Sequence, residues 1–201
     1  MTAKRLTALL IALLALAALW GQFVLNGSKP GLENWGWRLW DLMRFFTILT
    51  NALVAVQMGF LALRGRVPAD LEATACLNIG MVGIIYHTLL APETPFTGAD
   101  WYTDFAFHTA VPLLVPLWFL GFGDRNLSLR HLPFWLIWPL VYCIYAMIRG
   151  AATGRYPYFF LDVGQYGLPR ILANIAGLVA VFALAGLILW VFSRALRQKS
   201  V

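Results

Sequence analysis

Six long apolar runs, separated by short stretches that carry most of the charged residues, form the main pattern of the chain. A bilayer core about 30 Å thick requires about 20 consecutive apolar residues in α-helical conformation, and each run approaches or exceeds that length. Asp70 precedes the third run, and Pro133 and Pro169 stand at the starts of the fifth and sixth, as is typical of helix N-termini. The pattern predicts transmembrane helices at residues 6–25, 39–63, 71–90, 102–122, 132–148 and 170–192.

The first apolar run shares one feature with secretory signal peptides, because Lys4 and Arg5 precede it. Its apolar core is longer than the roughly 7 to 15 residues that are usual in a signal peptide. The run also lacks a clean small-x-small cleavage pattern before the next polar residues. We therefore expect it to be a retained transmembrane helix.

The amino-acid composition is that of a membrane protein. Of 201 residues, 61% are hydrophobic and only 12% are charged, and the mean hydropathy is +0.73. Soluble domains usually carry about twice that charged fraction. The sequence therefore predicts an all-α, polytopic membrane protein in which a single six-helix transmembrane domain occupies residues 1–201.

The positive charges are distributed unevenly between the two sides of the predicted bundle. One side holds nine Lys and Arg residues and the other holds five, which by the positive-inside rule favours both termini in the cytoplasm of a cell membrane. The outer side is rich in Trp and Tyr, including Tyr156 and Tyr158, as an interfacial aromatic belt would be. The net charge of +6 forms no clustered basic patch, so nucleic acid is not an expected partner.

Thr47 and His108 are unusual because they lie within apolar runs, where a polar side chain is costly unless it has a partner or lines a cavity. In the predicted topology, a helical rise of about 1.5 Å per residue places each of them on the order of 10 Å inside the outer boundary of the membrane. Five further polar residues fall in the same outer half: Asp41, Arg44, Asn51, His87 and Asp104. We expect a polar cavity that opens toward the outer leaflet.

Spacing along the predicted helices brings these polar residues onto common faces. Arg44, Thr47 and Asn51 are spaced i, i+3, i+7 on the second helix, and Asp104 and His108 are spaced i, i+4 on the fourth. Each residue also has an ordinary structural explanation, since a threonine in a membrane helix usually bonds a backbone carbonyl of its own helix. Convergence from several helices favours a functional site over these separate explanations.

Four short segments resemble those of a known family. They are residues 44–51 (RFFTILTN), 85–90 (IYHTLL), 107–112 (FHTAVP) and 156–162 (YPYFFLD). Together with the six predicted spans, their order and spacing resemble the androgen-induced-gene and androgen-dependent TFPI-regulating protein family, including its bacterial six-helix branch. Animal members of this family are integral-membrane hydrolases with a threonine nucleophile and a histidine, which act on fatty acid esters of hydroxy fatty acids.

The resemblance implies that this chain hydrolyses a lipid ester taken from the bilayer, because the family's threonine maps onto Thr47 and its histidine onto His108. A threonine hydroxyl needs a base to remove its proton during attack, and histidine is the usual base near neutral pH. Asp104 is placed to fix the tautomer of the imidazole. Three residues are candidates to donate to the oxyanion or to bind a fatty-acid carboxylate: Arg44, Asn51 and His87.

Two other functions stay open at this point. His87 and His108 lie at similar predicted depth and could ligate a haem, or the cavity could bind or transport lipid without catalysis. The chain has no Cys or His cluster with the spacing of a zinc site, and Cys76 and Cys143 lie at opposite predicted depths. The hydrolase prediction therefore includes no metal and no other cofactor.

Overall fold

The protein is built almost entirely from helices. In a computed structural model, which describes residues 1–92 and 96–198, helices account for 82% of the chain and the described residues form no strand. Six helical segments are long and apolar enough to cross a membrane: Ala3–Asn26, Phe46–Arg64, Ala69–Leu90, Gly98–Phe122, Leu129–Thr153 and Leu168–Arg197. The predicted all-α, six-span membrane fold is confirmed.

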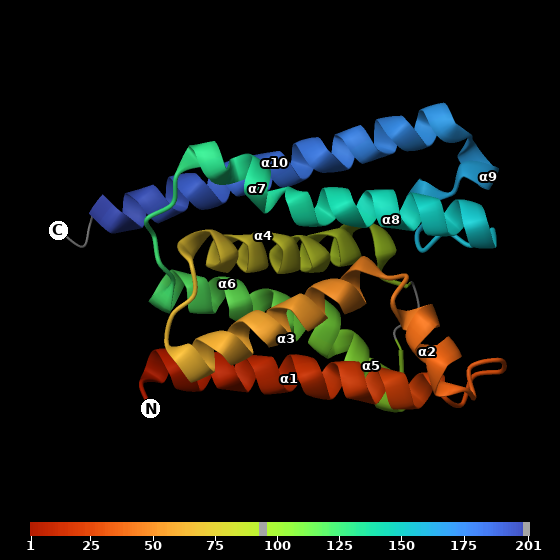
Figure 1. Cartoon of the computed structure of the whole chain (residues 1–201), viewed down its shortest axis with the longest axis horizontal. Coiled ribbons are helices and arrows are strands. Elements are labelled where there is room, and N and C mark those ends of the chain that lie inside the picture. The colour runs from red at the N-terminus through yellow and green to blue at the C-terminus, as the bar shows by residue number, and fades with distance from the viewer. Residues whose placement is uncertain (93–95, 199–201) are drawn as a thin grey trace.

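Several of these spans are composed of more than one helix. In chain order the elements are α1 (Ala3–Asn26), α2 (Trp35–Leu42), α3 (Phe46–Arg64), α4 (Ala69–Ile85), the π-helical turn η1 (Tyr86–Leu90), α5 (Gly98–Phe105), the π-helical turn η2 (Ala106–Ala110), α6 (Val111–Phe122), the 3₁₀ turn η3 (Leu129–His131), α7 (Leu132–Trp135), α8 (Ile137–Thr153), the 3₁₀ turn η4 (Phe159–Leu161), α9 (Val163–Tyr166) and α10 (Leu168–Gln198). The two termini lie at the same end of the bundle (Figure 1), as an even number of spans requires. The cytoplasmic location of that end stays a prediction.

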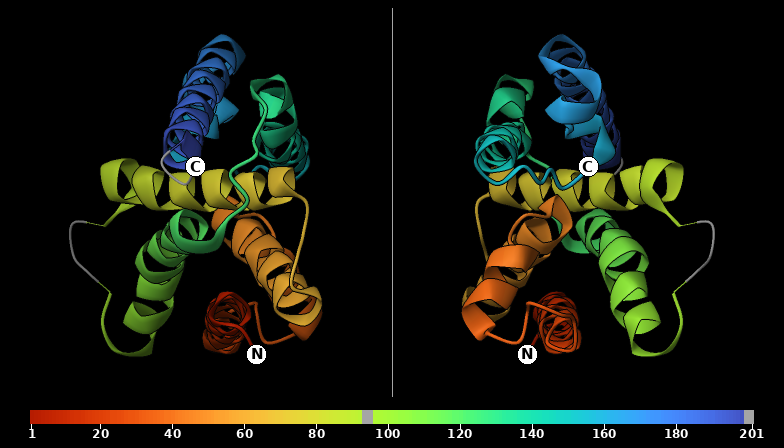
Figure 2. Two further views of the ribbon diagram at one scale, coloured as in Figure 1. Left: turned by 90° about the vertical axis from the view of Figure 1, so that its left-hand side faces the viewer. Right: turned by 90° about the vertical axis from the view of Figure 1, so that its right-hand side faces the viewer.

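Helix α4 is the central element of the bundle. It crosses between one group of helices formed by α1, α3 and the α5–α6 span and a second group formed by α8 and α10 (Figure 2). Eleven of its residues are buried, among them the polar Glu72, Thr74 and Asn78. In contrast, few residues of α10 are buried, and many of its large apolar side chains are exposed, as in a lipid-facing helix. Helix α4 therefore lies in the interior of the bundle, and α10 lies at its periphery.

The predicted second span, residues 39–63, is not one continuous helix. Helix α2 ends at Leu42, and α3 begins at Phe46, so Met43, Arg44 and Phe45 form a break between them. Arg44 consequently does not share a helix face with Thr47, and the expected i, i+3 relation between these two side chains is wrong. The structural span begins at Phe46, so the break lies at its start, where the freed backbone atoms still need hydrogen-bond partners.

Side chains of α8 satisfy the backbone carbonyls at the end of α2. The Tyr142 hydroxyl donates to the Arg44 carbonyl over 2.8 Å, and the Tyr145 hydroxyl donates to the Met43 carbonyl over 3.1 Å. The Arg149 guanidinium donates to the carbonyl of Trp40. These bonds replace those of a continuous helix, so α8 holds the break open and fixes where α3 begins.

A π-helical turn places His108 on the fourth span. The Val111 N–H donates to the Ala106 carbonyl, five residues back, at the end of η2. Pro112 lacks the N–H that would bond the His108 carbonyl in a regular α-helix, which explains why the ordinary pattern is interrupted here. Such π turns are found frequently at functional sites.

Close packing between α4 and the fourth span depends on Gly83. A Cβ atom at this position would lie 2.8 Å from the Pro112 Cβ and 3.2 Å from the His108 carbonyl oxygen. We expect Gly83→Ala to destabilise the protein by about 1–3 kcal/mol through overpacking, measured as a lower thermal midpoint in detergent. Gly80→Ala is the matched control, because a Cβ there lies 3.8 Å from Pro116. Equal midpoints for the two variants would contradict this packing.

Candidate active site

A polar cleft of about 400 Å³ lies at the end of the bundle opposite the termini. Its walls come from the ends of α1 and α3, from α2, η1, α5 and η2, and from the loop that precedes η4. Ten polar residues line it: Gln22, Asn26, Lys29, Asp41, Thr47, Tyr86, Asp100, Asp104, His108 and Tyr158. Thr47 and His108, which the sequence places on different spans, thus line one cavity.

His108 is held by Asp104 and Tyr86. Its Nδ1 atom lies 2.9 Å from the Asp104 Oδ1 atom and 3.1 Å from the Asp104 backbone carbonyl, so Nδ1–H is the donor when Asp104 is ionised. The ring stacks on Tyr86, with centroids 3.7 Å apart and planes inclined by 7°. The Tyr86 hydroxyl in turn donates to the Asp104 carboxylate, at 2.8 Å from each oxygen. This arrangement leaves the Nε2 atom of His108 free to accept a proton.

Thr47 is the second residue of α3 and is half-buried. The first backbone N–H groups of a helix have no partner within the helix, and the helix dipole adds partial positive charge at this end. Negative charge that develops near the Thr47 hydroxyl is therefore stabilised by the start of α3. A continuous helix over residues 39–63 would not have this feature, so the break before Phe46 matters for the chemistry.

Tyr158 lies against the start of α3. Its hydroxyl accepts a hydrogen bond from the Phe46 N–H over 3.1 Å, and its side chain interacts with the side chain of Thr47. Burial raises the pKa of the Tyr158 phenol, with the contacts to Thr47 and Phe46 opposing the shift. The phenol therefore stays protonated at neutral pH and keeps a proton to donate. The sequence analysis assigned Tyr158 to an interfacial aromatic belt and did not predict these contacts with Phe46 and Thr47.

An apolar pocket adjoins the polar cleft on the other side of Thr47. It is lined by side chains of α3, α4, α8, α10 and η4, among them Val82, Leu178 and Phe182. Thr47 and Tyr158 line both this pocket and the polar cleft. The Thr47 hydroxyl thus lies where an apolar chain and a polar group of one molecule would meet.

The other predicted site residues do not line the polar cleft. Arg44 lines a neighbouring cavity, and Asn51 is fully buried, donating from Nδ2 to the Thr47 carbonyl over 2.9 Å. The exposed His87 pairs with the Thr109 hydroxyl, 3.0 Å from its Nε2 atom. Asn51 therefore contacts the backbone of Thr47 without reaching the cleft. Arg44 and His87 have partners outside the cleft. A haem ligated by both histidines would require His87 and His108 to face the same cavity, but His87 does not line the cleft that His108 lines.

Tyr86 and Tyr158 contact the proposed catalytic residues, but the sequence analysis did not single out either tyrosine as a site residue. It also did not single out four other polar residues that line the cleft: Gln22, Asn26, Lys29 and Asp100. Each tyrosine stands in a short segment of the family resemblance, beside His87 and Pro157 respectively. A tyrosine near the end of a membrane helix is common at the lipid interface, so position alone does not distinguish a site residue. The only sequence feature that could have indicated Tyr86 and Tyr158 as site residues is their position in these two segments.

Comparisons with known proteins leave the cleft to be interpreted from its own geometry. No protein-family model matches the chain, and no curated protein and no solved structure is significantly similar to it.

Proposed function

We propose that the protein is an intramembrane hydrolase of lipid esters, with Thr47 as the nucleophile and His108 as the general base. The observation that carries the proposal is the position of Thr47, which lines both a polar cleft and an apolar pocket. His108 and Asp104 line the same polar cleft and bond each other. An ester lipid needs both surroundings at once, one for its acyl chain and one for the reacting carbonyl and water.

The reaction proceeds in two halves through an acyl-enzyme. The Thr47 Oγ atom attacks the ester carbonyl carbon while His108 takes the hydroxyl proton on Nε2. The C–O bond to the alcohol then breaks, and His108 returns the proton to the leaving alkoxide oxygen. A water molecule, deprotonated by His108, attacks the acyl-threonine and releases the fatty acid and the free Thr47 hydroxyl. Asp104 holds the imidazole orientation and stabilises its charged form throughout.

The tetrahedral intermediates carry negative charge on the former carbonyl oxygen. Hydrogen-bond donors that are fixed before the reaction stabilise such an oxyanion strongly. The protonated Tyr158 hydroxyl is the proposed donor, and the helix dipole adds partial positive charge at the start of α3, where the Phe46 N–H already donates to that hydroxyl. In the proposal they take the oxyanion role for which the sequence analysis named Arg44, Asn51 and His87 as candidates.

The substrate enters the proposal from the family resemblance. Fatty acid esters of hydroxy fatty acids, or esters of similar shape, would come from the bilayer of the cell membrane, with the first carbons of one acyl chain in the apolar pocket, whose volume is about 50 Å³, and the rest of that chain outside it. Water would come from the polar cleft. The chemistry requires no metal or other cofactor, since each proton transfer is assigned to His108.

Covalent labelling tests the proposed nucleophile directly. An activated hydroxyl attacks the phosphorus of a lipophilic fluorophosphonate, fluoride leaves, and a stable phosphonate ester remains. The purified wild-type chain should therefore be labelled, and peptide mass spectrometry should place the adduct on Thr47. Thr47→Ala should remove the label. Thr88→Ala is the matched control, because the Thr88 hydroxyl is exposed and bonds only the Ile84 carbonyl of its own helix. Undiminished labelling of Thr47→Ala would exclude Thr47 as the nucleophile, whereas a wild-type chain that is not labelled at all would leave a non-catalytic lipid-binding or transport protein as the better explanation.

A further inference from the structure

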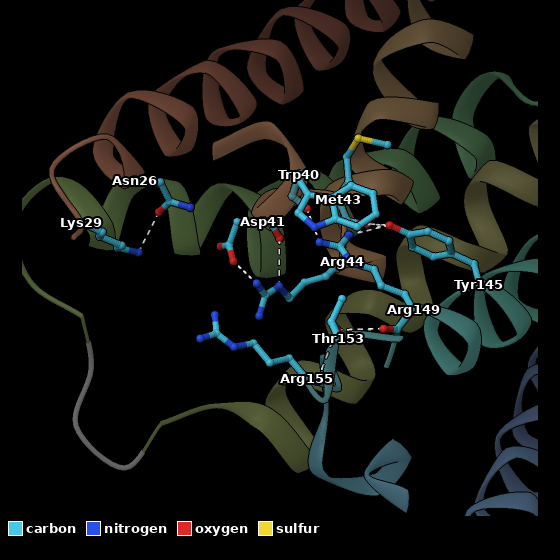
Figure 3. Close-up of polar contacts among 10 residues, drawn as sticks. All are labelled: Asn26, Lys29, Trp40, Asp41, Met43, Arg44, Tyr145, Arg149, Thr153 and Arg155. Atoms are coloured by element: carbon cyan, nitrogen blue, oxygen red, sulfur yellow. Dashed lines mark hydrogen bonds and ion pairs between the residues drawn. The ribbon is translucent and has the colours of Figure 1, made fainter. Parts of the chain in front are cut away.

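A second polar cavity lies beside the active-site cleft and is rich in arginine. It has a volume of about 370 Å³, and Asp41 lines both this cavity and the cleft. Three arginines from separate segments line the second cavity: Arg44 from the α2–α3 break, Arg149 from α8 and Arg155 from the loop after α8. Figure 3 shows Arg44 bonded to Asp41, Arg155 on the same side of the cavity, and Arg149 against Trp40 and Tyr145.

Arg149 is the most unusual member of this group because it is buried, with 7% of its surface exposed. Its guanidinium donates to the Tyr145 hydroxyl over 2.6 Å and to the Trp40 carbonyl, and it lies 3.9 Å from the centre of the Trp40 ring. All of these partners are neutral. No carboxylate within the described ranges 1–92 and 96–198 forms an ion pair with Arg149. A buried charge is costly unless an opposite charge compensates it.

The cavity as a whole has excess positive charge. Asp41 is paired with Arg44, so this pair is neutral overall. Arg155 is exposed, and in the described part of the chain its guanidinium, like that of Arg149, has no acidic partner. Two positive charges are therefore left uncompensated around one cavity. A ligand that carries two negative charges on one compact group would balance them.

We propose that this arginine cavity binds a phosphate monoester, independently of any reaction at Thr47. A phosphate monoester carries a charge of about −1.5 to −2 near neutral pH, which matches the two uncompensated arginines. A carboxylate would leave one of them unbalanced. Guanidinium groups bind phosphate oxygens through paired, charge-assisted hydrogen bonds, and Arg149 is already fixed in orientation by Tyr145 and Trp40. The phosphate belongs to a lipid headgroup or to a soluble phosphate ester.

The aromatic residues of the cavity are suited to either source. Trp37 and Trp40 line it beside the arginines, and Trp37 is largely exposed. Tryptophan is enriched where protein meets the headgroup region of a bilayer. The same indole rings provide an optical signal, because a charged group bound beside them changes their fluorescence.

Tryptophan fluorescence titrations of the purified full chain in detergent test the proposal. The probes are a single-chain lysophosphatidic acid, soluble glycerol 3-phosphate and zwitterionic lysophosphatidylcholine. We expect the wild type to bind a phosphate monoester in preference to lysophosphatidylcholine, and Arg155→Gln to weaken this binding about tenfold. Arg155→Lys should lose less, because it keeps the charge. Arg170→Gln is the matched control, since Arg170 is exposed at the same end of the bundle but does not line the cavity.

The outcomes separate the two sources of phosphate. Binding of lysophosphatidic acid alone assigns the cavity to a lipid headgroup, and equal binding of glycerol 3-phosphate assigns it to a soluble ester; both depend on Arg155. Equal affinity of the wild type and Arg155→Gln would overturn the proposal, and so would equal binding of the zwitterionic probe or no binding of either phosphate. Labelling of Thr47 is unaffected by any of these results, so the hydrolase proposal stands or fails separately.

Discussion

Thr47→Ala is expected to lower the turnover of a lipid ester by at least about 10³-fold, because the proposed acyl-enzyme cannot form without the hydroxyl. The loss should appear in kcat more than in KM, since the apolar pocket that would hold the acyl chain keeps its other walls. The measurement is steady-state hydrolysis of a hydroxy-fatty-acid ester in mixed micelles.

Thr47→Ser is the informative companion to this variant. It keeps the attacking oxygen at the start of α3 and removes only a methyl group, so it should retain a large part of the activity. If Thr47 had only a structural role, both variants should lose activity to a similar extent, because both lose the packing of the methyl group. Turnover by Thr47→Ala within about tenfold of the wild type would exclude Thr47 as the nucleophile.

The six spans could be predicted from the sequence because length and hydropathy determine which segments enter a bilayer. Each predicted span overlaps the corresponding structural one, with boundaries shifted by up to seven residues, the largest shift being at the start of the second span. Another error concerns Arg149, which the sequence assigns to a loop beyond a span ending at residue 148. Helix α8 continues to Thr153, and Arg149 is buried. Because arginine is rarely buried, the burial of Arg149 could be predicted only with knowledge of the groups that its guanidinium contacts in the fold.

The break between α2 and α3 has no local signal, since neither glycine nor proline occurs among Met43, Arg44 and Phe45. Its cause lies far along the chain, because the bonds from Tyr142 and Tyr145 span 98 and 102 positions. Such tertiary partners override helix propensity and are invisible to periodicity. The break is also what turns a threonine inside an apolar run into a threonine at a helix start.

Some contacts of the candidate site could likewise be predicted from the sequence, and others could not. The Asp104–His108 bond was predictable because residues spaced i, i+4 lie side by side on a helix. The roles of Tyr86 and Tyr158 were not, because one stacks on a histidine 22 positions away in sequence and the other reaches a backbone N–H over 112 positions. Local spacing predicts pairs within a helix, whereas contacts between helices require the fold.

His108→Gln should lower turnover by about 10²–10⁴-fold, the range that general acid–base catalysis contributes. Asp104→Asn should have a comparable effect although Asp104 touches no reacting atom, because an amide cannot stabilise the charged imidazole and can favour the wrong tautomer. Both side chains are only partly exposed, and each bonds the other, so thermal midpoints must be measured alongside turnover.

The double variant distinguishes one catalytic unit from two separate supports. If Asp104 acts through His108, the combined replacement should lose no more activity than His108→Gln alone, as for residues of a hydrolytic triad. Losses that multiply would mean that Asp104 contributes independently, for instance by holding Tyr86 and the wall of the cleft through its two 2.8 Å contacts. Tyr86→Phe removes those contacts while keeping the aromatic ring against His108, so a small loss in that variant, beside a large one in Asp104→Asn, assigns the carboxylate to the imidazole.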